Sequence, residues 1–328
     1  MEGKARQKEE DMAENETSVR GRVIRDLIAH VTNDNLIGRK IKNGELRKKM
    51  VEPPWKCPDI FQYTLIDMEI DSYSKTCKEE EHEHFTMEYL EPKENPNLNK
   101  VVLQLHGGGY IGGMRNAYRT FAGLYSEVGK RIPVLTVDYR VAPEHPYPAA
   151  LEDAAAAYFW LLNKGFRAEQ IIVAGDSAGG GLAMALVMYL RDHDYEMPGG
   201  IVAMSPWTDL TASGESYDSN YERDPLFGNT RDSLIYNHDY VGKHSPKEPY
   251  ISPLFGDFSD FPPMLIQVGD YEMLMSDSVS AAKKAKEAGA KVRLSIYEGM
   301  FHVFQMAMLL MPESKRAWME VGRFLELT

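Results

Sequence analysis

Apolar runs alternate with polar segments over most of the chain. Six short runs, rich in β-branched and aliphatic residues, have the pattern of buried strands: Val101–Leu105, Val134–Val137, Ile171–Ala174, Ile201–Met204, Met264–Val268 and Val292–Ile296. Helical patterns lie between or after them, at Ala149–Lys164, Gly180–His193, Ser276–Ala288 and Pro312–Leu327. Buried strands joined by helices are typical of a parallel sheet covered on both faces.

The N-terminal part lacks this alternation. Residues 1–15 are highly charged and predict a disordered tail. Residues 16–55 predict two helices, the first over Val19–Val31 and a weaker one over Leu46–Val51. The apolar face predicted for the first helix is made of Val23, Leu27, Ile28 and Val31.

Residues 56–328 predict the main domain, which starts with two strands of period-two alternation. These are Tyr63–Asp71 and His84–Leu90, expected to pair as antiparallel edge strands joined by the charged loop Lys78–His84. Residues 211–245 interrupt the later strand and helix alternation and are rich in tyrosine. We expect this segment to be a helical insertion that forms a cap over the strand ends, together with the N-terminal helices.

Composition excludes several classes of protein. The net charge of −12 argues against a nucleic-acid partner or an anionic membrane surface. No apolar run is long enough to span a bilayer, and Met1–Glu16 lacks the apolar core of a secretory signal. The two cysteines, Cys57 and Cys77, provide neither a disulfide framework nor metal-ligand spacing. These features predict a cytoplasmic protein without an integral membrane segment.

A nucleophile elbow is the sharpest chemical signal. Gly175-Asp176-Ser177-Ala178-Gly179 follows a predicted buried strand and opens a predicted helix. Glycines on both sides of the serine allow a strained strand-to-helix turn that exposes the hydroxyl. Ser177 is therefore the predicted nucleophile.

A glycine run follows the strand Val101–Leu105. His106-Gly107-Gly108-Gly109-Tyr110 can direct unpaired backbone amides at one oxyanion. We expect the donors to be the N–H groups of Gly108, Gly109 and Ala178, and His106 to anchor the loop rather than act as a base.

The base and the acid are expected after the last two strands. His302 follows the final strand, where a chain order of serine, acid and histidine places the base. Asp270 and Glu272 both lie in the turn after Met264–Val268, and either carboxylate could hold the imidazole. The pattern of residues alone leaves this choice open.

Taken together, these motifs resemble the hormone-sensitive-lipase-like family of α/β-hydrolases, the bacterial family IV esterases. The resemblance extends from about Val101 to Phe324 and is carried by blocks in the family's order: HGGGY (106–110), DYRVAPEHPYPAALEDA (138–154), GDSAGG (175–180), SPWTDL (205–210), YISPL (250–254) and EGMFHVF (298–304). It implies a mostly parallel eight-stranded sheet with helices on both faces and a helical cap.

The resemblance also favours one acid. The family carries an aspartate nine residues after the proline that opens the strand and about thirty before the histidine. Glu272 lies nine residues after Pro263 and thirty before His302, so it occupies that position. The chain departs from the family by having glutamate there. Asp277 is then expected to be a supporting carboxylate.

The expected reaction is hydrolysis of short- to medium-chain acyl esters through an acyl-enzyme, with no metal and no organic cofactor. Tyr110, Asp176, Trp207, Met300 and Phe301 are the expected substrate-pocket residues. An amidase or deacylase would use the same three catalytic groups. A non-catalytic receptor of this fold, as in the gibberellin receptors, would lack the histidine that His302 provides. Self-association into a homodimer is compatible with the resemblance.

Overall fold

The computed structural model describes residues 17–33, 56–71, 82–307 and 310–328. One eight-stranded sheet has the order β1-β2-β4-β3-β5-β6-β7-β8. Its strands are β1 (Phe61–Asp71), β2 (His82–Pro92), β3 (Val101–Leu105), β4 (Val134–Asp138), β5 (Ile171–Asp176), β6 (Gly200–Met204), β7 (Met264–Gly269) and β8 (Val292–Tyr297). β2 pairs antiparallel with both β1 and β4, whereas every other pair is parallel.

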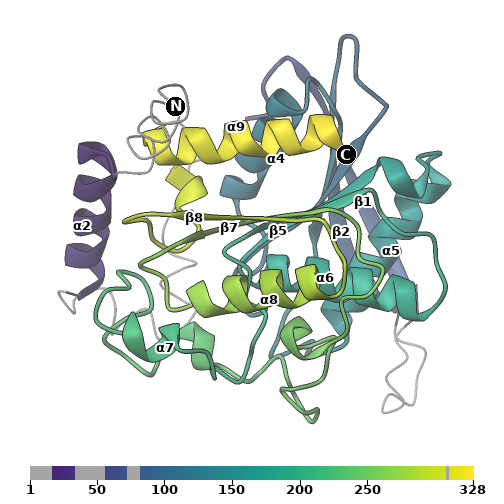
Figure 1. Ribbon diagram of the computed structural model, residues 1–328. Coiled ribbons are helices and arrows are strands. Elements are labelled where there is room, and N and C mark those ends of the chain that lie inside the picture. Colours follow the sequence, from purple (N-terminus) through teal and green to yellow (C-terminus); the bar gives the residue numbers. More distant parts are fainter. Residues whose placement is uncertain (1–16, 34–55, 72–81, 308–309) are drawn as a thin grey trace.

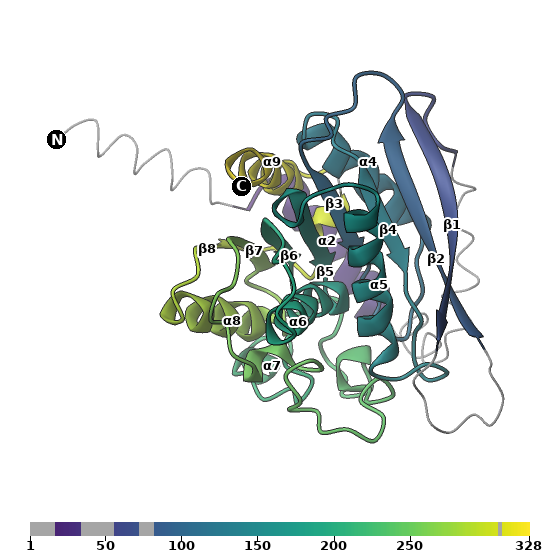
Figure 2. The same cartoon turned by 90° about the vertical axis from the view of Figure 1, so that its right-hand side faces the viewer.

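Helices cover both faces of this sheet (Figure 1). α4 (Asn116–Val128) and α9 (Pro312–Leu327) lie on one face, and α5 (Ala149–Asn163), α6 (Ala178–Asp192) and α8 (Met275–Glu287) lie on the other. Figure 2 shows the sheet running from β1 on the right to β8 on the left. The inner strands are buried along their whole length because both faces carry helices.

The predicted strands are all present, with ends that differ by a few residues. The prediction that Val292–Ile296 is buried was wrong, because β8 is the last strand of the sheet and its residues are partly or fully exposed. The antiparallel edge pair is confirmed, but β2 begins at His82, so the end of the predicted charged loop belongs to the strand. Helix α4 was not among the predicted helices. Its side chains Tyr118, Phe121 and Tyr125 are buried against the sheet and α9.

The first N-terminal helix is present as α2 (Val19–Asn33), but the predicted apolar face was wrong in part. Val23 and Leu27 are exposed, whereas Ile24 and Ile28 pack against Met300, Phe301 and Phe304. The helix has apolar residues on more than one side, and its contact with the residue 300–304 loop decides which side is buried. The predicted tail 1–15 and the predicted helix Leu46–Val51 lie outside the residues that the structure describes. The side chain of Val31 is not among those described.

The segment 211–245 is less helical than predicted. It contains only the four-residue helix α7 (Ser216–Ser219) and the 3₁₀ turn Leu234–Tyr236 as helical elements, and turns make up much of the remainder. It is nevertheless packed, since Tyr217, Phe227, Ile235 and Tyr240 belong to the main hydrophobic core. The segment lies on the α8 side of the sheet in Figure 1.

Candidate active site

Ser177 lies in a sharp turn between β5 and α6. Its backbone has φ 52° and ψ −122°, a conformation that costs free energy for a residue with a side chain. The turn is possible because a Cβ at Gly179 would lie 2.1 Å from the Leu105 carbonyl oxygen, and one at Gly175 would lie 2.2 Å from that of Gly179. The Ser177 N–H donates to the Met204 carbonyl at 2.9 Å, which fixes the turn to the end of β6.

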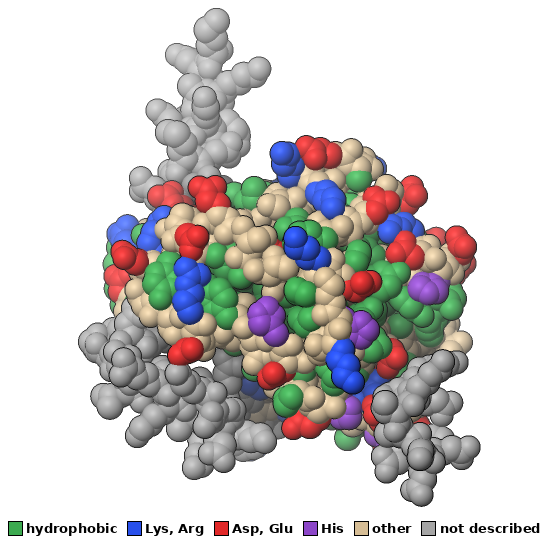
Figure 3. Space-filling model, turned by 90° about the horizontal axis from the view of Figure 1, so that it is seen from below, with side chains coloured by type: hydrophobic (Ala, Val, Ile, Leu, Met, Phe, Trp, Pro, Cys, Tyr) green, Lys and Arg blue, Asp and Glu red, His purple; other side chains and the backbone are tan. Residues whose placement is uncertain are grey.

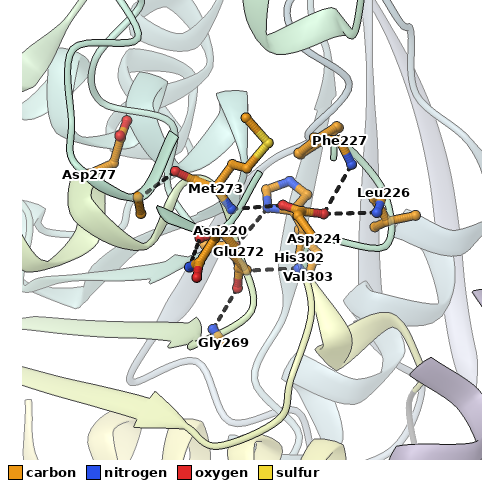
Figure 4. A network of polar contacts seen from close by, with 12 residues as sticks. Asn220, Asp224, Leu226, Phe227, Gly269, Glu272, Met273, Asp277, His302 and Val303 are labelled. Carbon is orange, nitrogen blue, oxygen red and sulfur yellow. Dashed lines mark hydrogen bonds and ion pairs between the residues drawn. The ribbon is translucent and has the colours of Figure 1, made fainter. Parts of the chain in front are cut away.

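His302 contacts Glu272. The imidazole Nδ1 lies 2.9 Å from Glu272 Oε2, and both side chains are buried. The second carboxylate oxygen, Oε1, accepts from the Gly269 N–H at 2.6 Å and from the Ser205 hydroxyl at 2.7 Å. Figure 4 shows the carboxylate of Glu272 between Gly269 and His302. A buried carboxylate with these donors can hold the imidazole with its other nitrogen, Nε2, available for proton transfer.

The other acid candidate, Asp270, faces elsewhere. Its Oδ1 accepts from the Gly299 N–H at 2.5 Å, and its Oδ2 lies 3.8 Å from the Arg223 guanidinium. Partial burial raises the pKa of Asp270 despite these partners. Asp277 has other partners, because its Oδ2 accepts from the N–H groups of Thr208 and Asp209. Of the two candidates, the structure therefore places Glu272 on the histidine.

Ser177 and His302 are tied to consecutive residues at the end of β6. Ser177 is bonded to the carbonyl of Met204, and the Val303 N–H, next to His302, donates to Ser205 Oγ at 3.1 Å. The predicted nucleophile, base and acid thus gather at the carboxyl edge of the parallel strands.

The glycine run forms a tight loop after β3. Gly108 and Gly109 have φ of 128° and 63°, and a Cβ at Gly108 would lie 2.7 Å from the Gly112 carbonyl oxygen. Within the part of the chain that the structure describes, the N–H groups of Gly108, Gly109 and Ala178 donate to no protein acceptor. These amides remain available to an oxyanion.

Buried polar groups support this loop from behind. The Gly107 N–H donates to Asp176 Oδ1 at 3.1 Å and to the Tyr118 hydroxyl at 2.9 Å. The Tyr139 hydroxyl donates to the His106 carbonyl, and the two rings stack 4.0 Å apart. Burial lowers the pKa of His106 to about 4 and raises that of Asp176 to about 6. A neutral, stacked His106 fits the predicted anchoring role.

The segment 211–245 is hydrogen-bonded to the turn that carries Glu272 (Figure 4). The Asn220 amide donates to the carbonyl oxygens of Asp270 and Glu272 at 3.0 and 2.8 Å. Asp224 accepts from the N–H groups of Leu226 and Phe227 with Oδ1, and from the Met273 N–H with Oδ2. Burial raises the pKa of Asp224.

Two apolar side chains of the same segment approach His302 and the glycine loop after β3. The Phe227 ring centroid lies 4.7 Å from that of His302. Leu234 packs so closely on Gly109 that a Cβ there would lie 1.7 Å from Leu234 Cδ1. Both Ser177 and His302 are only 7% exposed.

The predicted pocket residues are mostly packed in the interior. Tyr110 stacks on Tyr240 at 3.7 Å, and Trp207 is also buried. Met300 and Phe301 pack under α2, next to His302. The Asp176 carboxylate is engaged with Gly107 and Tyr118. Contact of these five residues with substrate stays a prediction.

Sequence reasoning missed the residues that hold and cover the site: Ser205, Asn220, Asp224, Phe227 and Leu234. A signal was available for Ser205, because it directly follows a buried strand at the same sheet edge as Ser177 and Glu272. The other four lie in a segment without periodicity, where no strand end or motif marks them.

Comparisons with known proteins agree with this geometry. Residues 102–306 match the protein family described as having the alpha/beta hydrolase fold. An esterase of Acinetobacter venetianus is 36% identical over 71% of this chain and 77% of its own. An acetyl-hydrolase of Streptomyces hygroscopicus is 37% identical over 74% of this chain and 80% of its own. A solved esterase of the bacterial hormone-sensitive lipase family aligns with TM-score 0.77 and 31% identity, over 95% of this chain and 99% of the other.

The fold and these matches define an α/β-hydrolase. The chain belongs, more narrowly, to the hormone-sensitive-lipase-like family of carboxylesterases and is a carboxylic ester hydrolase. Among the described residues, no helix is both long and apolar enough to cross a bilayer.

Proposed function

We propose that this carboxylesterase is a serine hydrolase in which Ser177, His302 and Glu272 form the catalytic triad. The observation that carries the proposal is the 2.9 Å contact between His302 Nδ1 and Glu272 Oε2, beside the strained turn at Ser177. A buried carboxylate on Nδ1 orients the imidazole and stabilises the imidazolium that forms during proton transfer.

The proposed reaction has two steps, acylation of Ser177 and hydrolysis of the acyl-enzyme. Ser177 Oγ attacks the ester carbonyl while His302 Nε2 takes the hydroxyl proton, and His302 then gives that proton to the departing alcohol. Water repeats the sequence on the acyl-enzyme, releasing the acid and restoring Ser177. The free N–H groups of Gly108, Gly109 and Ala178 stabilise the oxyanion in both steps, and losing one such donor typically costs about 2.7–4 kcal/mol of transition-state stabilisation.

The proposed substrates are small-molecule esters with short to medium acyl chains. Phe227 against His302 and Leu234 against Gly109 narrow the space next to the reacting atoms. Relatives that act on small acyl groups support the same choice, including the acetyl-hydrolase of Streptomyces hygroscopicus and an ethyl acetate hydrolase of Pseudomonas putida, which is 31% identical.

Hydrolysis of p-nitrophenyl acetate, butyrate and decanoate by wild type and Ser177→Ala tests the proposal. We expect the two shorter esters to be preferred and the variant to be inactive while folding normally. A Ser177→Ala variant that retains wild-type activity would overturn the assignment of the nucleophile. A parallel assay on an acetanilide distinguishes an esterase from an amidase, which would cleave the anilide at a comparable rate.

A further inference from the structure

Ser205 lies between the acid and the base of the site. Its hydroxyl donates to Glu272 Oε1 at 2.7 Å and accepts from the Val303 N–H at 3.1 Å. The side chain has no exposed surface, so water does not replace either contact. One hydroxyl group therefore bonds both the carboxylate of the triad and the backbone that follows His302.

The backbone at both ends of this link is strained. Ser205 has φ 47° and Val303 has φ 50°, although both residues carry side chains. A β-branched residue in the left-handed region is a conformational outlier that persists only where surrounding contacts impose it. The bond from the Val303 N–H to Ser205 Oγ is one such contact, and it acts directly after His302.

The strand that carries Ser205 fixes its position in turn. The Ser205 N–H donates to the Gln267 carbonyl of β7 at 2.6 Å, and the preceding carbonyl, of Met204, accepts from the Ser177 N–H. The end of β6 is thus bonded to all three turns that carry Ser177, Glu272 and His302. Because the Ser205 hydroxyl is held at the end of a strand, it can fix the distance between Glu272 and His302 more rigidly than a hydroxyl on a loop could.

We propose that Ser205 is a positioning residue of the esterase, whose hydroxyl fixes the Glu272 carboxylate relative to the His302 loop. The proposal rests on the proposed triad. Glu272 Oε1 receives two donors, from Ser205 and Gly269, while Oε2 is left to His302. Without the Ser205 donor, the carboxylate is free to turn away from the imidazole, and the imidazolium loses part of the negative charge that stabilises it.

A pair of kinetic experiments on p-nitrophenyl butyrate tests the proposal. Ser205→Ala is expected to lower kcat by roughly ten- to a hundredfold, as for loss of a hydrogen bond to a charged group, with little change in KM. The acid limb of the kcat/KM profile is expected to move to lower pH, because a displaced carboxylate stabilises the imidazolium less. In a Glu272→Ala background, Ser205→Ala should cost no more than a few-fold, since the carboxylate that it positions is gone.

Ser252→Ala is the matched control. Ser252 is equally buried, and its Oγ accepts from the Leu210 N–H at 2.8 Å, so this variant also leaves a buried N–H unpaired. We expect it to leave the acid limb in place. If Ser205→Ala lowers kcat by the same factor with and without Glu272, or leaves the acid limb unmoved, Ser205 has only a structural role. An inactive wild-type protein, or an active Ser177→Ala, would instead refute the triad itself.

Discussion

The two acidic residues of one turn differ in what their side chains touch. Asp270 and Glu272 are separated by one residue, yet Glu272 contacts the His302 imidazole while Asp270 contacts the Gly299 N–H and the Arg223 guanidinium. The longer glutamate side chain is fully buried and held by two donors besides the histidine. Contact with the imidazole, rather than nearness in sequence, decides which carboxylate can act on the base.

Glu272→Gln should therefore lower kcat by roughly 10³–10⁴-fold, because an amide can hold the imidazole in the wrong tautomer and cannot balance its charge. Asp270→Asn is the matched control, since its remaining oxygen can still accept from the Gly299 N–H. Its kcat should stay within several-fold of wild type. Steady-state assays on p-nitrophenyl butyrate, with circular dichroism to verify folding, compare the two. The reverse ranking would make Asp270 the acid.

Asp176 predicts a pH effect on stability. Burial raises its pKa from 3.8 to about 6, so the folded protein holds a proton there that the unfolded chain has released. A raised pKa contributes stability that is present below pH 3.8 and lost as the pH rises through 6. The free energy of unfolding of wild type minus that of Asp176→Asn should then fall by about 2 kcal/mol between pH 4 and pH 6. Urea unfolding at several pH values measures it, and a constant difference would contradict the prediction.

Functional residues that lie directly after a strand could be predicted from the sequence. Residues whose role depends on tertiary packing could not. Ser177, Glu272 and His302 each follow a strand of the parallel part of the sheet, so the sheet pattern placed them at one edge. The apolar side of α2 was ambiguous, because Ile24 and Val23 are adjacent and only packing on Met300 separates them.

At the scale of elements, the segment 211–245 acts on the site through a few buried hydrogen bonds. Asn220 and Asp224 bind the backbone of the turn that carries Glu272, Phe227 packs on His302, and Leu234 packs on Gly109. A second element, α2, reaches the same turn, since the guanidinium groups of its Arg25 and of Arg223 both lie over the Tyr271 ring. The turn is held from both sides.

Asp224→Asn tests this connection between segment and turn. The amide oxygen of the variant can accept from the N–H groups on one side of Asp224, either Leu226 and Phe227 or Met273. Its NH₂ group would then face an N–H donor on the other side. We expect a loss of about 1–3 kcal/mol in the free energy of unfolding and a fall in kcat of roughly tenfold. Asp218→Asn is the control, because the Asp218 side chain is exposed and its partner Arg231 lies on the surface. Urea unfolding and ester hydrolysis are the measurements. Equal effects of the two variants would show that the Asp224 contacts do not hold the turn.

The order of strands and helices could be predicted from the sequence, but the structure of residues 211–245 could not. Alternating apolar runs and helical patterns predicted the sheet and most of its helices, because burial on both faces leaves a strong periodic signal. Residues 211–245 bury aromatic side chains from turns, which have no fixed period. The expectation of a helical insertion therefore failed where the packing is irregular.

At the scale of the whole molecule, the net charge of −12 should affect which esters reach the site. Figure 3 shows that acidic and basic side chains are intermixed on the face below the sheet, so the effect comes from the summed field rather than one patch. At low salt an ester with a carboxylate on its acyl group is repelled. Raising the ionic strength from about 0.01 to 0.15 M shortens the Debye length from roughly 30 to 8 Å and screens this repulsion.

The predicted result is a several-fold rise in kcat/KM with salt for mono-p-nitrophenyl succinate and no change for p-nitrophenyl butyrate. The two esters have similar acyl lengths, so the neutral one controls for effects of salt on the enzyme itself. Initial rates at low substrate concentration give kcat/KM directly. Equal salt dependence of both esters would mean that the field at the entrance differs from that of the molecule as a whole. Local cations, such as the guanidinium of Arg223 next to the acid turn, would then govern the approach of substrate.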